Sequence, residues 1–236
     1  MKVWVTGAAG SVGSALLERF PHAVGTDIEV DVTDREQVQR FLRTENPDLV
    51  FHCAAAKHAP DGELDPAHVS RVNIDGTRNI LESDGRVVLA STCKACDPET
   101  AYGASKLIAE RMTLNAGGTV ARFFNVIETQ GNVFEIWANT PEPEPLKAMP
   151  CWRYFIHLDR AVELMDECSR LPTGRYAVNP PAAEYIPDLA RKLYPTRQIV
   201  EVPPRRGDRI REPLHANSET ATEMGGLLRV TSPHDC

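Results

Sequence analysis

Two side chains suited to proton transfer, Tyr102 and Lys106, stand four residues apart. Residues at this spacing lie on one face of a helix, so the sequence predicts that the Lys106 ammonium sits near the Tyr102 phenol. A nearby cation favours the phenolate, and it is expected to lower the tyrosine pKa from its usual value of about 10. Tyr102 would then serve as general base or acid for an alcohol proton. Thr92, which precedes the helix, would hydrogen-bond the same substrate oxygen.

The elements that must position this pair are a strand, a turn and a helix. An apolar run over residues 87–90 predicts a buried strand, which ends at Ser91 and Thr92. Asp97 and Pro98 mark a turn, and a helical pattern follows it. A tyrosine and a lysine four residues apart more often mark a solvated helix face. The preceding strand and the glycine-rich loop near the start of the chain make the catalytic interpretation the stronger one.

That glycine-rich loop lies between the first predicted strand, residues 2–6, and a helix with an apolar face. In this context Gly7 permits a tight turn, Gly10 lets the backbone approach a pyrophosphate, and Gly13 allows close packing of the helix. The start of the helix adds amide groups and the positive end of its dipole. The alternative is an ordinary glycine-rich turn. We predict that a dinucleotide is bound here by Gly7, Ala9, Gly10, Ser11, Val12 and Gly13.

The cofactor preference is indicated by an acidic residue, Asp27, which follows the second predicted strand 20 residues after Gly7. A carboxylate at this place bonds the ribose 2′-hydroxyl of NAD and repels the 2′-phosphate of NADP. No arginine or lysine follows before Arg35, which favours NAD over NADP. A loop amide can replace a basic side chain, so NADP stays open. Further along, the strand predicted over residues 48–56 ends in small residues that leave room for a cofactor: Ala54, Ala55 and Ala56.

The stretch around the tyrosine resembles a known family. Residues 91–98 read STCKACDP and residues 102–106 read YGASK. Together they are similar to the extended short-chain dehydrogenase/reductase family, and most of all to CapD-type UDP-N-acetylglucosamine 4,6-dehydratases, whose pattern is approximately S-T-D-K-A-x-x-P-x-x-x-Y-G-x-[ST]-K. The resemblance runs from Lys2 to about Leu214. One departure matters, because the family has an aspartate where this chain has Cys93.

The resemblance also assigns roles near the cofactor and the sugar. Asp31 and Val32 resemble the family's adenine-contacting pair. Asn73 stands in an Asn-x-x-Gly-Thr motif whose asparagine supports the active-site backbone. Lys57 belongs to a Lys-His-x-Pro segment and would lie near the sugar, unless it is an ordinary loop lysine. Asn125 would face the sugar or its phosphates, and its alternative is a turn cap.

Two arginines are candidates for the diphosphate of a nucleotide sugar. Arg153 lies in a segment that resembles the family's Thr-Arg-Tyr-Phe, and a guanidinium pairs bidentately with phosphate oxygens. Arg206 lies in Arg-Arg-Gly-Asp, which resembles the family's phosphate-binding Arg-Pro-Gly-Glu. The alternative for Arg206 is a surface charge pair with Asp208.

Composition excludes several other classes. The formal charge of −7 offers no basic stripe for nucleic acid. The first residues meet a glycine too early for a signal peptide, and no apolar run approaches a membrane span, so a cytoplasmic protein without membrane contact is expected. Six scattered cysteines do not indicate a disulfide framework. Cys93 and Cys96 form a C-x-x-C, which can serve redox chemistry or half a zinc site, but no second one accompanies it and no metal site is predicted.

The predicted fold class is α/β, a doubly wound parallel sheet (Rossmann fold) with a small C-terminal substrate-binding lobe. Residues 1–126 would form the NAD(P)-binding core, including the helix with Tyr102 and Lys106. Residues 127–236 would form the lobe, which is not an independent domain. The ligand crevice is expected outside the carboxyl ends of the strands. The family resemblance implies a homodimer that pairs through the helices flanking the active site.

Three functions remain open at this point. The first is a UDP-N-acetylglucosamine-type 4,6-dehydratase, which oxidises C4 transiently and uses the residues at Cys93 and Lys94 for elimination. Lys94 would abstract the C5 proton, whereas a neutral thiol delivers a proton less readily than a carboxyl. The second is a nucleotide-sugar epimerase or 4-ketoreductase, which needs only Thr92, Tyr102, Lys106 and NAD or NADP. The third is a non-enzymatic dinucleotide sensor, against which the intact tyrosine and lysine argue.

Overall fold

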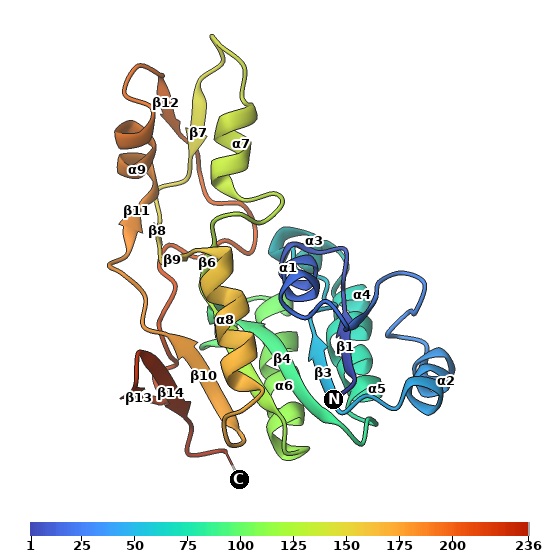
Figure 1. Ribbon diagram of the computed structural model, residues 1–236. Helices are drawn as coiled ribbons and strands as arrows, with labels where there is room; N and C mark the ends of the chain where they lie inside the picture. The colour runs from blue at the N-terminus through green and yellow to red at the C-terminus, as the bar shows by residue number, and fades with distance from the viewer. Residues whose placement is uncertain (236) are drawn as a thin grey trace.

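One large sheet forms the centre of the computed structural model, which describes residues 1–235, and its strand order is β13-β14-β10-β5-β4-β3-β1-β2 (Figure 1). The strands from β2 to β10 pair in parallel, and the β13–β14 hairpin joins β10 in antiparallel fashion. The strands are β1 (Val3–Thr6), β2 (Val24–Thr26), β3 (Leu49–His52), β4 (Arg86–Thr92), β5 (Thr119–Phe123), β10 (Gly174–Val178), β13 (Thr220–Met224) and β14 (Leu227–Thr231).

Helices cover both faces of this sheet, which confirms the predicted doubly wound class. One face carries α1 (Ser11–Arg19) and α8 (Leu158–Cys168), which pack against each other. The other face carries α2 (Arg35–Glu45), α4 (Pro66–Ser70), α5 (Gly76–Ile80) and α6 (Ala101–Asn115). The longest of these, α6, has 15 residues. Within residues 1–235 no helix is long and apolar enough to cross a bilayer.

The two-sided burial follows from the apolar runs of the strands. Successive side chains of a strand point to opposite faces, so a strand covered on both sides must be apolar throughout. Val5 and Phe51 pack with Leu16 of α1 in the core of one face, whereas Trp4 and Val50 belong to the core on the other face. Consecutive residues of the same short strands therefore contribute to the apolar cores on opposite faces of the sheet.

Two helix starts illustrate how local sequence positions these elements. Asp34, and not the preceding Thr33, caps α2, because the Asp34 side chain accepts hydrogen bonds from the amides of Glu36 and Gln37. At the second start, Asp65 caps α4 and Pro66 occupies the first turn, where its missing amide costs nothing. Aspartate and threonine are both good caps, and their surroundings decide between them.

Part of the chain after residue 126 forms a lobe that stands apart from the sheet in Figure 1. Its apolar centre includes Trp137, Leu146 and Ile186. The division at residue 126 stays a prediction, but the sheet itself crosses it, because β10, β13 and β14 come from the second half. The lobe elements are α7 (Val133–Asn139), β7 (Leu146–Ala148), β8 (Trp152–Arg153), β9 (Phe155–Ile156), β11 (Glu184–Tyr185), α9 (Ile186–Leu193) and β12 (Ile199–Glu201), and β9 pairs with β6 (Asn125–Val126), which precedes the lobe.

A buried ionic network ties α6 to β5, β10 and the end of the chain. Arg122 of β5 lies 2.6 Å from Glu110 and 2.7 Å from Glu219, and its side chain is fully buried. Arg175 of β10 lies 2.7 Å from the same Glu110 and 3.2 Å from Asp235. Burial alone would raise the pKa of Glu110, but the two guanidiniums outweigh burial and lower it. The C-terminal hairpin is thus anchored to the sheet by charge as well as by strand pairing.

Candidate functional site

A cavity of about 1050 Å³ opens beside the glycine loop and the ends of β3 and β4. It is the crevice expected outside the carboxyl ends of the strands. The structure brings most of the predicted site residues to its wall: Gly7, Ala9, Gly10, Ser11, Val12, Gly13, Asp27, Asp31, Val32, Ala54, Ala55, Ala56, Lys57, Thr92, Lys94, Tyr102 and Asn125. Five others, Asn73, Cys93, Lys106, Arg153 and Arg206, are not among the residues that line it.

The glycine loop has the close approaches that only glycine allows. Gly7 has φ +67°, and a Cβ there would lie 2.6 Å from the backbone nitrogen of Ala54. A Cβ on Gly13 would lie 2.2 Å from the Gly7 carbonyl oxygen, so α1 packs directly on the loop. Gly10 is the N-cap of α1 and offers no side-chain cap. The first amides of α1 therefore stay open to the cavity, as a phosphate-binding loop requires.

The acidic residue after β2 lies at the far end of this loop. Asp27 Oδ2 accepts a hydrogen bond from the Ala9 amide at 2.9 Å, which fixes the carboxylate at the cavity wall. Asp31, further along, accepts from the Thr33 amide at 2.8 Å and also lines the cavity. The two carboxylates make this end of the cavity acidic.

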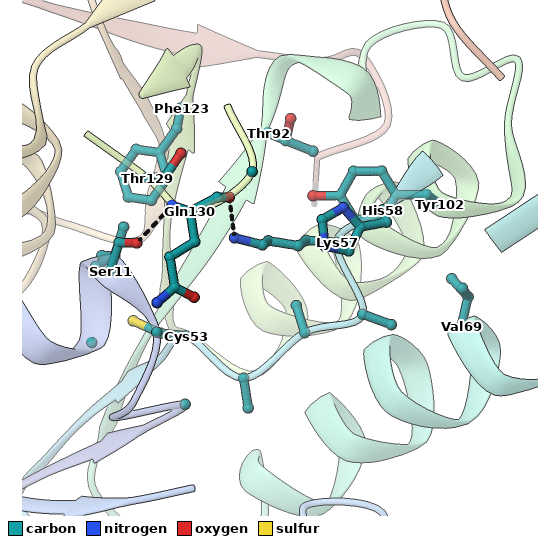
Figure 2. A pocket seen from close by; sticks show the side chains of 18 of the residues that line it. Ser11, Cys53, Lys57, His58, Val69, Thr92, Tyr102, Phe123, Thr129 and Gln130 are labelled. Atoms are coloured by element: carbon teal, nitrogen blue, oxygen red, sulfur yellow. Dashed lines mark hydrogen bonds between the residues drawn. The ribbon is translucent and has the colours of Figure 1, made fainter. Parts of the chain in front are cut away.

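Tyr102 and Thr92 both place a hydroxyl-bearing side chain at the cavity wall. They come from the start of α6 and the end of β4, and they lie side by side in Figure 2, with Ser11 on the opposite side. The pKa of Tyr102 is raised to about 12, because burial outweighs the charge of Lys94 and the hydrogen bond from Thr92, which both lower it. The expected lowering of the Tyr102 pKa is therefore wrong.

Lys106 does not sit where the helix spacing suggested. Its ammonium, Nζ, donates to the Ala90 carbonyl at 2.7 Å, and the residue is 2 % exposed. Burial lowers its pKa to about 8. The cation that acts on the Tyr102 phenol is Lys94, eight residues before it on the other side of the turn. Tyr102 and Lys106 do lie in one helix, as expected, but the lysine ammonium hydrogen-bonds to β4 instead of approaching the phenol.

Asn73 supports the site from behind, as the resemblance implied. Its side chain accepts from the Ala56 amide at 2.9 Å and donates to the Ala56 carbonyl at 3.1 Å. It also donates to the Ser105 hydroxyl of α6 at 2.9 Å. Asn73 lies in a π-helical turn, Arg71–Asp75, between α4 and α5. Such turns often occur at functional sites, and this one aims the amide at the loop after β3.

A loop after β6 bridges the cavity through Gln130. The Gln130 amide donates to the Ser11 hydroxyl at 3.3 Å, and Lys57 Nζ donates to the Gln130 carbonyl at 3.3 Å (Figure 2). Lys57 is therefore held at the cavity wall between the glycine loop and the lobe. Gln130 was not expected from the sequence, because a backbone contact between distant loops leaves no residue pattern.

The most prominent residue that sequence reasoning missed is Glu212. Its carboxylate is buried and lies 2.7 Å from Lys94 Nζ and 3.4 Å from Arg153 Nε. It also accepts from Asn125 Nδ2 at 2.7 Å and from the Cys93 thiol at 3.4 Å. Four predicted site residues thus meet at one acidic side chain. Arg153 is bound there instead of pointing into the cavity.

Arg206 lies outside this arrangement. Its side chain is 74 % exposed, and its Nε is 3.7 Å from Glu63. The alternative, a charge pair between Arg206 and Asp208, is wrong, because Arg205 makes that pair at 3.0 Å, and the phosphate-binding role of Arg206 stays a prediction.

The two cysteines of the C-x-x-C are buried beside charged groups. Burial, and after it the Glu212 charge, raises the pKa of Cys93, so it stays a neutral thiol. Cys96 accepts from Arg122 Nη1 at 3.1 Å, and burial raises its pKa to about 12. Over residues 1–235, no three His, Cys, Asp or Glu side chains gather in a way that could hold a metal ion.

Comparisons with known proteins agree with this arrangement. Residues 22–231 match a family described as polysaccharide biosynthesis protein. The chain is 28% identical to the probable polysaccharide biosynthesis protein EpsC of Bacillus subtilis, over 94% of this chain and 46% of the relative. It is 26% identical to a UDP-N-acetylglucosamine 4,6-dehydratase (inverting) of Campylobacter jejuni, over 80% of this chain and 62% of the relative. The chain thus spans about half the length of the curated relatives it matches.

Solved structures show the same fold. The crystal structure of the UDP-glucose 4-epimerase of Thermus thermophilus, in complex with NAD, matches with a TM-score of 0.83 at 22% identity, covering 91% of this chain and 90% of that one. At this identity the likeness establishes the fold alone, a doubly wound α/β sheet. With nearly all of its length matched by one family, the chain belongs to the polysaccharide biosynthesis protein family.

Proposed function

We propose that this chain is an enzyme that uses a nicotinamide dinucleotide to oxidise a hydroxyl group of a nucleotide sugar. The observation that carries the proposal is the placement of Thr92 and Tyr102 in the same cavity as the glycine loop. A phenol and a hydroxyl beside a dinucleotide site are what hydride removal from an alcohol carbon requires, since the alcohol proton must leave as the hydride does.

The residues present fit the cofactor. A Cβ at Gly7 or Gly13 would collide with backbone atoms, so only glycine allows the tight loop, and the open amides of α1 would face a pyrophosphate bound there. Val32 and Asp31 would flank the adenine. The small residues Ala54, Ala55 and Ala56 would leave room for the ring system. Of the two cofactors, NAD is favoured by the Asp27 carboxylate at the cavity wall, which would bond a ribose 2′-hydroxyl and repel a phosphate.

The chemistry assigned to the side chains is proton transfer at one oxygen. Thr92 would hold the sugar oxygen, and Tyr102 would accept its proton. An oxidised nicotinamide dinucleotide, when bound, would supply a positively charged ring that accepts the hydride and becomes neutral. The Lys94 ammonium already lowers the pKa of Tyr102, although burial outweighs it. Lys106, bonded to Ala90, holds the end of β4 and the start of α6 together.

A UDP-N-acetylglucosamine-type 4,6-dehydratase is the first candidate for the overall reaction, and two relatives described as such enzymes support it. After oxidation at C4, one group removes the C5 proton and another protonates the departing C6 hydroxyl. The resemblance gives these steps to Cys93 and Lys94. Lys57 and Asn125, at the cavity wall, would contact the sugar or its phosphates.

An epimerase or 4-ketoreductase of nucleotide sugars is the second candidate, and a specific observation favours it. Cys93 lies behind the cavity wall with its thiol directed at Glu212, and Lys94 is paired with the same carboxylate. Neither group is available as a base for elimination in this arrangement, whereas Thr92 and Tyr102, which oxidation and re-reduction at C4 would use, both line the cavity. A homodimer through the helices that flank the site, including α6, remains a further prediction.

The cofactor site can be tested with two glycine variants that differ in steric cost. Gly13→Ala places a Cβ 2.2 Å from a backbone oxygen, so we expect it to unfold the loop and lower the melting temperature. Gly10→Ala makes a milder contact, 3.3 Å from the Gly7 carbonyl oxygen, so we expect a smaller loss of stability than for Gly13→Ala but dinucleotide binding weakened at least about tenfold, since the methyl group would face a bound pyrophosphate.

Thermal unfolding and calorimetric titration with NAD measure the two effects. Unchanged NAD affinity in a folded Gly10→Ala protein would show that the dinucleotide does not bind at this loop. NADP titrated in parallel tests the role of Asp27: we expect weaker binding than for NAD, and an Asp27→Ala variant should narrow the difference.

A further inference from the structure

The Glu212 carboxylate is the meeting point of groups from three other segments of the chain. Its side chain is 1 % exposed, and it lies behind the residues that line the cavity. Lys94 and Cys93 reach it from the 3-10 turn after β4, and Asn125 from β6. Arg153 reaches it from β8. Every one of these partners approaches as a hydrogen-bond donor or a cation, so the environment is built for an ionised carboxylate.

Resting on the proposed function, we propose that Glu212 is a positioning residue that holds Lys94 as an ammonium at the cavity wall, so that Lys94 donates to the sugar and does not act as a base. The geometry is an ion pair of 2.7 Å between Lys94 Nζ and Glu212 Oε1. Lys94 also donates to Asn125 Oδ1 at 3.3 Å, which leaves it directed along the cavity wall.

The charges support this arrangement. Burial alone would raise the pKa of Glu212, but Lys94 and Arg153 outweigh burial and lower it to about 2. Burial alone would lower the pKa of Lys94, but Glu212 outweighs burial and raises it. An amine without a free electron pair cannot remove a carbon-bound proton. The Lys94 charge also favours the Tyr102 phenolate, which the oxidation step uses as its base. The same ion pair keeps Lys94 protonated, so Lys94 cannot act as the base for elimination.

The inference separates the two candidate reactions. Oxidation and re-reduction at one carbon need Tyr102 and a donor at the wall, and Lys94 paired with Glu212 is such a donor. Elimination needs a base for the C5 proton, and Lys94 becomes one only when Glu212 releases it. If the role of Glu212 were purely structural, it would hold Arg153 of the lobe in place without determining the protonation state of Lys94.

The test follows the protonation of Lys94 directly, without any nucleotide sugar. The chain has six lysines, so a protein labelled with ¹³C at lysine Cε gives few resonances, and loss of one in Lys94→Arg assigns Lys94. In the wild-type protein we expect the Lys94 midpoint to lie above the ordinary lysine value of 10.5. In Glu212→Gln we expect it to fall by at least about one pH unit, and in Glu212→Asp to be partly restored.

Two internal controls keep the result interpretable. Glu99→Gln removes an exposed carboxylate that pairs at 3.0 Å with Arg209, a residue three positions before Glu212. This variant should leave the titration midpoint of Lys94 unchanged. The Lys106 resonance reports the fold, because burial lowers its pKa to about 8 and unfolding would return it toward 10.5.

The outcomes are distinct. An unchanged Lys94 midpoint in a folded Glu212→Gln protein overturns the inference. If that variant unfolds, the wild-type titration decides, because a Lys94 midpoint below 10.5 overturns the inference as well. Failure of the wild-type protein to bind any nucleotide sugar would instead contradict the proposed function and leave these titrations unaffected.

Discussion

Replacing Tyr102 with phenylalanine is expected to lower turnover of the nucleotide-sugar substrate by about 10²- to 10⁴-fold, the usual contribution of a positioned general acid or base. The variant removes one oxygen at the centre of the cavity and leaves the buried ring in place. Affinity for NAD and the free energy of unfolding should change little. Initial rates measured with saturating cofactor, together with NAD titrations, check this prediction.

A matched control is Tyr185→Phe, which removes the hydroxyl of a lobe tyrosine that packs against Trp152. This variant should keep wild-type turnover. A Tyr102→Phe protein that retains turnover would contradict the assigned proton transfer. Loss of a measured turnover would in turn exclude a non-enzymatic dinucleotide sensor, because sensing has no use for the phenol.

The largest expected effect on stability comes from Arg122→Met. The guanidinium lies between Glu110 and Glu219 with no solvent exposure, so its removal leaves carboxylates buried without their main partner. Breaking a buried pair in this way typically costs about 3–5 kcal/mol in the free energy of unfolding. Denaturant unfolding at neutral pH measures the loss.

The comparison variant for this prediction is Arg78→Met, which breaks an exposed pair with Asp75 and should cost no more than about 1 kcal/mol. A similar small loss for Arg122→Met would show that the buried network contributes little to stability. Because Arg175 shares Glu110 with Arg122, the effects of changing both arginines should not be additive.

The fold was largely predictable because its signals are local. Short apolar runs, a glycine loop and acidic or proline starts of helices are each read within a few residues. The hairpin of β13 and β14 was missed although Gly225 and Gly226 separate its strands, both with positive φ. Two glycines between strands are a hairpin signal. Here the polar sequence of β13 concealed the alternation.

The sequence predicted which residues belong to the site better than it predicted which of them contact one another. The residues that line the cavity follow from motifs, but which cation faces Tyr102 depends on how α6 packs on β4. Lys94 and Glu212 are 118 residues apart, and nothing in the surrounding stretch indicates that the glutamate turns inward. Arg122 and Arg175 likewise look misplaced in buried strands until their partners from other segments are known. Such contacts arise only when distant segments pack together.

The central claim is hydride transfer from a hydroxyl-bearing carbon of a nucleotide sugar, and the most direct measurement follows that hydrogen. The protein is incubated with NAD and UDP-N-acetylglucosamine carrying deuterium at C4, and the product is analysed by mass spectrometry and NMR. We predict that the deuterium leaves C4 and appears on C6 of a product lighter by one water, or returns to C4 of an epimer, and that Tyr102→Phe abolishes either change. Recovery of the labelled substrate unchanged, from protein that binds both NAD and the sugar, would contradict the account.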